Sequence, residues 1–293
     1  MSHISTNNRD FEVLRDFLFE HLRDDSRRYY GVDDDAYIRA VTGQWFNDES
    51  NYDGRWALLD ERLPGVAPVL DMAAGCGTFV IYGLRHGRDV WGIEPEAWKR
   101  EYFSQKIQSI GLGQFSARII DAVGEKLPFP DEHFAVVTSY QTMEHVHDVA
   151  ACISEMLRVL RPGGVLIVQA PNYQGFYEPH YRMAMPPLPS QKLKRAYIRI
   201  RRKPAKGLET INWVTERQVL KSLATSNGII VERFEKFYAE KRATRLTKLM
   251  PSILRVEPVV TALNRGYAIF KKARSLINIA RRERTIDLWV TKI

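Results

Sequence analysis

The chain has 293 residues, of which 45% are hydrophobic and 27% are charged. This size and composition predict a folded globular protein and exclude a disordered chain. The two cysteines, Cys76 and Cys152, exclude a disulfide framework and lack the spacing of a zinc site, so we expect a reducing compartment, the cytoplasm. No run of about 18 apolar residues is present, and we therefore expect no membrane-spanning helix.

The net charge of +8 is unevenly distributed along the chain. Residues 1–179 contain 17 basic and 27 acidic side chains, whereas residues 180–293 contain 26 basic and 8 acidic ones. Such asymmetry indicates that one part of the protein meets an anionic partner, such as lipid head groups, a phosphorylated substrate or nucleic acid.

The first part of the chain has helical periodicity. Apolar residues recur at helical spacing from residue 9 to residue 63, with glycine breaks between the runs. We therefore predict a helical cap over residues 1–63, followed by the main domain over residues 64–293.

From residue 66 onward, short apolar strands alternate with amphipathic helices. The strands are predicted at 66–72, 89–94, 117–121, 134–140, 165–171, 229–237 and 285–293. The helices between them are predicted at 80–87, 95–111, 148–164 and 215–228, with Pro95 at a first helical position, Asp148 as an N-cap, and Thr215 with Gln218 as a capping box. This alternation predicts an α/β fold with a doubly wound, mostly parallel sheet.

Two insertions interrupt the alternation, at about residues 172–214 and 239–284. The first contains a proline-rich loop and a predicted basic helix, and the second contains predicted basic helices. In an open α/β sheet, such loops lie near the edge that binds ligands.

A glycine turn follows the first strand, in the sequence VLDMAAGCGTF. Gly75 and Gly77 are present, but the third glycine of the dinucleotide-binding pattern G-x-G-x-x-G is missing. Glu94 ends the second strand, where a carboxylate is well placed to accept hydrogen bonds from both hydroxyls of a ribose. Asp121 ends the third strand, where a carboxylate can accept a hydrogen bond from the amino group of an adenine.

Three further motifs follow in order: LPFPDEHFAVV at 127–137, EHV at 144–146 and LRPGG at 160–164. Together with the glycine turn and its acids, they resemble the class I S-adenosylmethionine-dependent methyltransferases, in particular the group similar to ubiquinone and menaquinone biosynthesis methyltransferases. The resemblance covers residues 66–171 and implies the seven-stranded, Rossmann-like fold of that family. One departure is Ala73, which occupies the first glycine position of the family pattern D-x-G-x-G-x-G.

The resemblance implies S-adenosylmethionine as cofactor. In the family, the glycine loop wraps the methionine part, the acid after the second strand holds the ribose, and the acid after the third strand faces the adenine. The cofactor-binding residues expected by this match are Asp71, Ala73, Gly75, Gly77, Glu94, Pro95, Asp121, Ala122 and Gln141.

His145 is the first candidate for a catalytic base, because imidazole has a suitable pKa and the family places this position near the sulfonium. The alternative is that Glu144 and His145 only brace the following helix. His147 with Asp148 is better explained as a helix cap. A metal site formed by Glu144, His145 and His147 is not required by any spacing, and no metal is predicted.

The loop after the fifth strand offers a second set of polar and aromatic groups. Tyr177, Glu178, His180 and Tyr181 suit a sugar, since polar groups bind hydroxyls and rings stack on its apolar face. The loop also resembles the acceptor-binding loop of family members associated with surface-polysaccharide biosynthesis. The alternative is a packed lid without direct contact to a ligand.

Basic amphipathic helices are predicted at 192–206 and 261–284. In the first, which Ser190 is expected to cap, Leu193, Ala196, Tyr197 and Ile200 share one face beside many cations. These helices suit an anionic membrane surface, which would make the protein peripheral on the inner face of a membrane. The alternative is that the apolar faces pack on the sheet and the charges are only solvated.

The function favoured by these features is O-methylation of a sugar hydroxyl on a glycan or a lipid-linked glycan precursor. A second hypothesis is methylation of a quinone-like or other small aromatic acceptor, which EHV and LPFPD support equally. A third is a nucleic-acid-binding protein that uses the basic region. The third is disfavoured because SYQTMEHV lacks the Asn/Asp-Pro-Pro-aromatic pattern of enzymes that methylate base amino groups.

Overall fold

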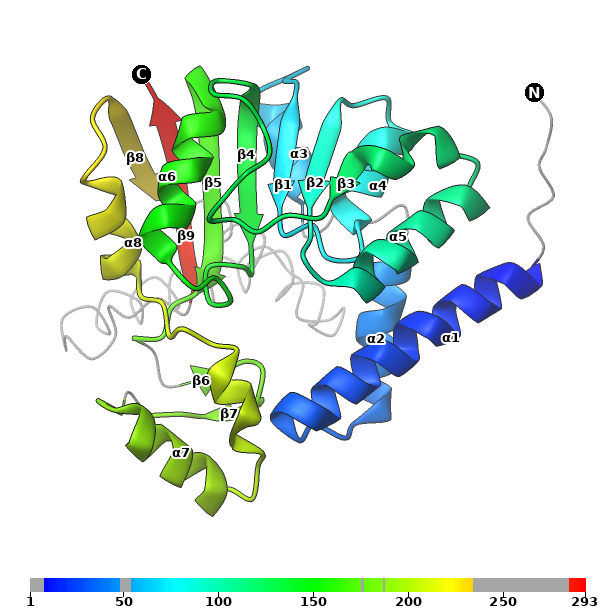
Figure 1. The fold of residues 1–293 in the computed structure, drawn as a ribbon, viewed down its shortest axis with the longest axis vertical. Helices are drawn as coiled ribbons and strands as arrows, with labels where there is room; N and C mark the ends of the chain where they lie inside the picture. Colours follow the sequence, from blue (N-terminus) through cyan, green and yellow to red (C-terminus); the bar gives the residue numbers. More distant parts are fainter. Residues whose placement is uncertain (1–7, 48–53, 175–176, 187, 234–284) are drawn as a thin grey trace, which may run out of the picture.

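The computed structural model describes residues 8–47, 54–174, 177–186, 188–233 and 285–293. Figure 1 shows a central sheet with helices on both faces and a second group of elements below one edge. The predicted insertion at 239–284, with the basic helices expected at 261–284, lies outside the described residues.

The central sheet has seven strands in the order β3-β2-β1-β4-β5-β9-β8. All neighbouring pairs are parallel except those of β9, which runs antiparallel to β5 and to β8. The predicted doubly wound, mostly parallel α/β fold is therefore confirmed. The strands are β1 (Val69–Met72), β2 (Val90–Ile93), β3 (Ile119–Ile120), β4 (Phe134–Tyr140), β5 (Leu160–Pro171), β8 (Ile229–Arg233) and β9 (Thr285–Lys292).

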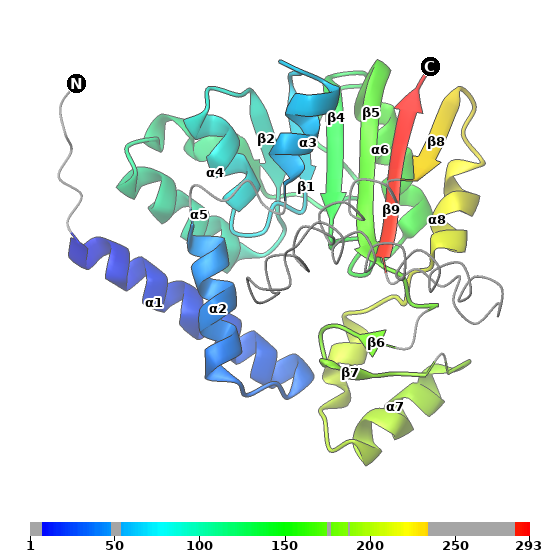
Figure 2. The same ribbon diagram turned by 180° about the vertical axis from the view of Figure 1, so that it is seen from behind.

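Helices bury both faces of the sheet. One core contains apolar residues of α6 and α8, and the other contains residues of α3, α4 and α5. Figure 2 shows α3 on the face opposite α6. The bounds are α3 (Arg55–Arg62), α4 (Thr78–Arg85), α5 (Ala97–Ser109), α6 (Val149–Val159) and α8 (Glu216–Leu223).

Local capping chemistry explains two helix starts that the sequence predicted. The Asp148 carboxylate accepts hydrogen bonds from the N–H groups of Ala150 and Ala151 and begins α6. The Thr215 hydroxyl accepts from the N–H of Gln218 and begins α8. Each cap satisfies N–H groups that have no partner inside the helix.

Several element boundaries differ from the prediction, and two of the differences have a local physical cause. Helix α5 begins at Ala97, with Glu96 as N-cap, and not at Pro95. The reason is that the Glu94 carboxylate accepts the N–H of Glu96 and holds Pro95 in the preceding turn. Strand β5 begins at Leu160, before the predicted turn, because Leu160 pairs with Phe134 ahead of a bulge.

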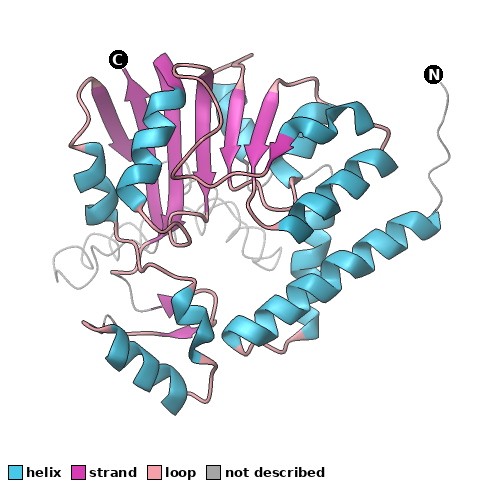
Figure 3. Cartoon of the chain, in the orientation of Figure 1, coloured by secondary structure: helices cyan, strands magenta, loops and turns pink. Residues whose placement is uncertain are grey.

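The N-terminal elements are α1 (Asn8–Asp25), the π-helical turn η1 (Ser26–Tyr30) and α2 (Asp35–Phe46). They lie below the carboxyl ends of the parallel strands, as does the first insertion (Figure 3). The insertion consists of β6 (Tyr177–Glu178), β7 (Met183–Ala184), α7 (Gln191–Ile200) and the 3-10 turn η3 (Ala205–Glu209). Another 3-10 turn, η2 (Gly113–Arg118), precedes β3.

Helix α7 begins at the predicted cap, because the Ser190 hydroxyl accepts from Leu193 N–H. Its expected apolar face does not pack on the sheet. Leu193 and Ile200 are 48% and 78% exposed, whereas Ile198, outside that face, is fully buried. Among the described helices, none is long and apolar enough to cross a membrane.

Candidate active site

The loop after β1 takes left-handed backbone conformations at three positions. Ala73, Gly75 and Gly77 have φ angles of 61°, 58° and 80°. A Cβ at Gly75 would meet nothing within 4 Å, whereas one at Gly77 would lie 2.4 Å from the Phe103 ring. Gly75 therefore leaves open space beside the loop, and Gly77 permits close packing. Ala73 takes a conformation that favours glycine, which explains the glycine in the family pattern.

Glu94 ties the glycine loop to the end of β2. Its carboxylate accepts the N–H of Gly75 and the N–H of Glu96, each at 2.9 Å. The side chain is buried, and burial raises the pKa of Glu94 above its ordinary value. The loop and the acid expected to hold a ribose are thus one hydrogen-bonded unit.

Asp71 forms a buried ion pair that the sequence did not predict. Its carboxylate lies 2.5 Å from Arg55 of α3, which also donates to the Thr138 hydroxyl at 3.0 Å. Burial raises the pKa of Asp71 to about 6, although Arg55 opposes that shift. Asp71 was expected among the cofactor-binding residues, and in the structure its carboxylate is paired with Arg55. No local sequence signal marks Arg55, because the contact joins two distant elements.

The remaining residues expected at the cofactor lie at the carboxyl ends of neighbouring strands. Asp121 follows β3, and its exposed carboxylate pairs with Arg100 at 2.7 Å. Ala122 is half-buried beside it, and Pro95 is exposed after β2. Gln141 follows β4 with a φ of 54° and donates its N–H to the Gln169 carbonyl.

His145 lies in the turn after β4. Its Nδ1 is 2.8 Å from the carbonyl oxygen of Thr210. Because a carbonyl only accepts, Nδ1 carries the hydrogen and Nε2 is left with the free lone pair. The residue keeps an exposed edge, yet the surrounding protein removes enough water to lower the pKa of His145 to about 4, with a further contribution from His180.

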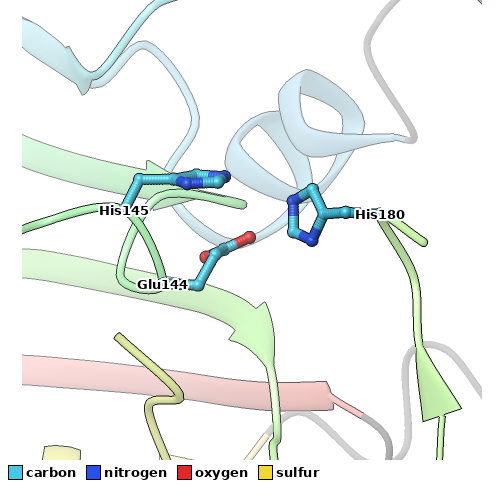
Figure 4. Close-up of side chains that lie close together, drawn as sticks. All are labelled: Glu144, His145 and His180. Atoms are coloured by element: carbon cyan, nitrogen blue, oxygen red, sulfur yellow. The ribbon is translucent and has the colours of Figure 1, made fainter. Parts of the chain in front are cut away.

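Glu144, His145 and His180 come together at this turn, although they derive from two loops (Figure 4). One ligand atom of each lies within 4.8 Å of those of the other two. The two imidazole rings are 5.0 Å apart, nearly perpendicular. Glu144 is fully buried, neither carboxylate oxygen has a hydrogen-bond partner, and burial raises its pKa to about 7. His147 is not part of this cluster.

His180 is held in place by Glu178. The Glu178 carboxylate accepts from His180 Nδ1 at 2.7 Å, from the Tyr173 hydroxyl at 3.1 Å and from the N–H of Tyr181 at 2.5 Å. Burial alone would lower the pKa of His180, but the hydrogen bond and charge of Glu178 outweigh it and raise that pKa. The ring of Tyr30 in η1 lies against the His180 ring, tilted by 30°, with ring centroids 5.2 Å apart.

Two residues expected at the acceptor, Glu178 and Tyr181, are buried and make hydrogen bonds to protein groups. Glu178 and Tyr181 are 0% and 1% exposed, and the Tyr181 hydroxyl donates to the Pro204 carbonyl. Both hold the loop that carries His180, because their polar atoms are occupied by protein groups. Tyr177 belongs to β6, and its side chain lies outside the described residues.

The segment after η3 clamps the turn that carries Glu144 and His145. The Asn212 side-chain amide donates to the carbonyls of Met143 and Val146, both at 2.7 Å, and its N–H donates to the Glu144 carbonyl. The hydroxyls of Thr210 and Tyr30 lie 3.1 Å apart. No local sequence signal marks Asn212, Thr210 or Tyr30, since each acts through contacts with residues far away in the chain.

Residues 70–168, which hold the glycine loop and the Glu144–His145 turn, match the family described as a methyltransferase domain. The matched segment covers about a third of the chain, and over that segment the chain is similar to methyltransferase domains. The matched segment contains β2 to β4, most of β1 and β5, and every residue expected at the cofactor.

Curated relatives are similar to the chain over part of its length. An uncharacterized methyltransferase of Mycobacterium sp. (strain KMS) is 32% identical over 174 residues, which covers 59% of this chain and 60% of that protein. A ubiquinone/menaquinone biosynthesis C-methyltransferase of Shewanella woodyi is 49% identical over 159 residues, which covers 48% of this chain and 62% of that protein. The chain thus spans about 60% of the length of these relatives.

Among solved structures, the chain is similar to geranyl diphosphate C-methyltransferase from Streptomyces coelicolor A3(2). The TM-score is 0.47 at 14% sequence identity, with 94% of this chain and 96% of that chain covered.

Proposed function

We propose that the chain transfers a methyl group from S-adenosylmethionine to a hydroxyl of a small polar acceptor, in particular a sugar. The observation that carries this proposal is the placement of Glu144, His145 and His180 at the carboxyl edge of the sheet that also holds the glycine loop. Ligands of open α/β sheets bind at that edge, where the strand order reverses.

The residues at the first two strand ends fit the cofactor. Gly75 leaves the space that a Cβ would fill, and the buried Glu94 carboxylate retains lone pairs beyond its two backbone contacts. In this proposal, the loop binds the methionine part, Glu94 binds the ribose hydroxyls and Asp121 faces the adenine. Bound S-adenosylmethionine supplies an electrophilic methyl group on sulfur.

The protein has to align the accepting oxygen with that methyl group and to assist loss of its proton. The oxygen–carbon bond forms as the carbon–sulfur bond breaks; the electron pair goes to sulfur, and the hydroxyl proton leaves to solvent. From the sequence, only His145 was expected to give this assistance. The structure groups His145 with Glu144 and His180, and we therefore assign it to the cluster as a unit.

Replacing Glu94 with glutamine should weaken S-adenosylmethionine binding by about 10- to 150-fold, since a charge-assisted hydrogen bond contributes about 1.5–3 kcal/mol. Isothermal titration calorimetry measures the effect. Glu101→Gln, an exposed carboxylate on α5, is the matched control and should bind as the parent does. Failure of the parent protein to bind S-adenosylmethionine would refute the proposed function.

A second candidate function is C-methylation of a quinone-like ring, which the similarity to the Shewanella C-methyltransferase favours. Incubation with S-adenosylmethionine carrying a ¹³C-methyl group separates the two functions. Nucleotide sugars, simple glycosides and demethylated quinones serve as acceptors. A methyl carbon resonance in the O-methyl region supports the leading function, whereas one in the aromatic C-methyl region supports the second.

We also propose that α7 brings the protein to an anionic membrane surface on the inner face of a membrane, which would suit a lipid-linked acceptor. Leu193 and Ile200 are exposed on this helix beside Lys192, Arg195 and Arg199. Exposed apolar side chains next to cations are typical of helices that lie in a lipid interface.

Reversing Lys192 and Arg199 to glutamate should lower binding to vesicles of phosphatidylcholine and phosphatidylglycerol by more than tenfold, at about 1 kcal/mol per basic residue near the surface. Flotation in a density gradient measures the bound fraction. The matched control reverses Arg85 and Arg161, which are exposed on other elements. Equal losses in both variants would show that only net charge matters and would contradict a lipid-binding role of α7.

A further inference from the structure

The side chains of Glu144, His145 and His180 are of the types that bind metal ions in proteins. Two imidazoles and one carboxylate offer one atom each within 4.8 Å of one another. Sets of two histidines and one carboxylate bind divalent first-row transition metals, whereas Mg²⁺ and Ca²⁺ prefer oxygen ligands.

Both histidines are oriented in the way that metal-binding histidines are. His145 directs Nδ1 to the Thr210 carbonyl, and His180 directs Nδ1 to the Glu178 carboxylate. Each neutral ring therefore keeps a free lone pair on Nε2. A hydrogen bond from the second ring nitrogen to a carbonyl or carboxylate fixes the tautomer and orientation of metal-bound histidines.

Glu144 supplies an independent indication of a missing partner. Its carboxylate is fully buried, and neither oxygen accepts a hydrogen bond. Figure 4 shows that it points toward the space between the two imidazole rings. A buried carboxylate without hydrogen-bond donors is costly, and a bound cation removes that cost by occupying the free lone pairs.

The charge around the cluster also favours a cation. Glu178 lies directly behind His180, so two buried carboxylates flank two imidazoles. The clamp formed by Asn212 fixes the turn that carries two of the three ligands.

The geometry points to a divalent transition-metal site formed by Glu144, His145 and His180. This inference rests on the proposed function, because the ion would bind and polarise the accepting hydroxyl, with His145 as a ligand. Zinc–nitrogen bonds are about 2.0–2.1 Å long, and ligand atoms within 4.8 Å of one another would need only small side-chain movements to bind one such ion. Three protein ligands leave positions open for the acceptor.

Titration of the full-length protein with Co²⁺ tests the site without any assay of activity. After treatment with a chelator and its removal, the parent protein should bind one Co²⁺ per chain and develop visible absorption bands. Mn²⁺, followed by electron paramagnetic resonance, should compete for the same site. His180→Ala and Glu144→Gln should each weaken Co²⁺ binding by at least tenfold.

His147→Ala is the matched control, because His147 is an exposed histidine beside the cluster that contributes no ligand atom to it. S-adenosylmethionine binding by calorimetry shows whether each variant is folded. A parent protein that binds S-adenosylmethionine but not Co²⁺ or Mn²⁺ would overturn the metal site and leave the proposed function standing. Equal Co²⁺ affinity in His180→Ala and His147→Ala would also overturn it. If Glu144→Gln fails to bind S-adenosylmethionine, His180→Ala alone decides the outcome.

Discussion

Replacing His145 with alanine should lower the turnover number by about 10²–10⁴-fold, the range of a side chain that assists proton removal. Alanine removes the free ring nitrogen from the cluster that we place at the accepting hydroxyl. The dissociation constant for S-adenosylmethionine should stay unchanged, since the glycine loop and Glu94 make no hydrogen bond to this ring. Steady-state kinetics and calorimetry on the same preparation separate the two quantities.

His147→Ala serves as the control for this substitution and should retain the parent's turnover. Retained turnover in His145→Ala would show that the Glu144–His145 turn only braces helix α6, as the alternative interpretation of the sequence holds. Supplying Co²⁺ or Mn²⁺ should raise the turnover of the chelator-treated parent but not that of His145→Ala.

Replacing Arg55 with methionine should lower the free energy of unfolding by about 3–5 kcal/mol, because it leaves the Asp71 carboxylate buried without its partner. Urea denaturation measures the loss. Combining Arg55→Met with Asp71→Asn should recover most of it, since no uncompensated charge then remains. A loss below about 1 kcal/mol for the single variant would contradict the buried ion pair.

The destabilisation by Arg55→Met should also depend on pH. The ordinary pKa of the Asp71 carboxyl is 3.8, and in the folded protein it is about 6. When the pKa of an acid is higher in the folded state than in the unfolded state, the free energy of unfolding falls as the pH rises from the unfolded-state pKa to the folded-state pKa. Loss of Arg55 raises the folded pKa further, so the variant should be destabilised less at about pH 5 than at about pH 7.5. Equal destabilisation at both values would contradict this coupling.

Local signals predicted much of the fold. The capping residues Asp148, Thr215 and Ser190 each begin the helix expected of them, because a cap needs only the next three residues. Strand β4 has the predicted bounds, since its apolar run is buried on both faces. The predicted boundaries were wrong where a residue from another part of the chain forms a contact. For example, Leu160 pairs with Phe134, and β5 therefore begins earlier than predicted.

Helix α7 shows the limit of periodicity. The spacing of Leu193, Tyr197 and Ile200 predicted one apolar face, but Ile198 is the residue that enters the core. The Tyr197 hydroxyl donates to the Ala184 carbonyl, so its polar tip sets how the helix docks. Spacing identifies which residues share a face, whereas docking depends on the surface that the helix meets.

The sequence by itself determined the α/β architecture, the glycine loop and the acids at the strand ends, because these depend on local backbone geometry and on strands that end at one edge. Only the tertiary structure decided that Asp71 is paired with Arg55 and that His180 joins Glu144 and His145. Those groupings arise from packing between segments far apart in the chain, and no local pattern encodes such contacts. The proposed chemistry at the acceptor depends on those long-range contacts, whereas the cofactor loop depends on the local sequence after the first strand.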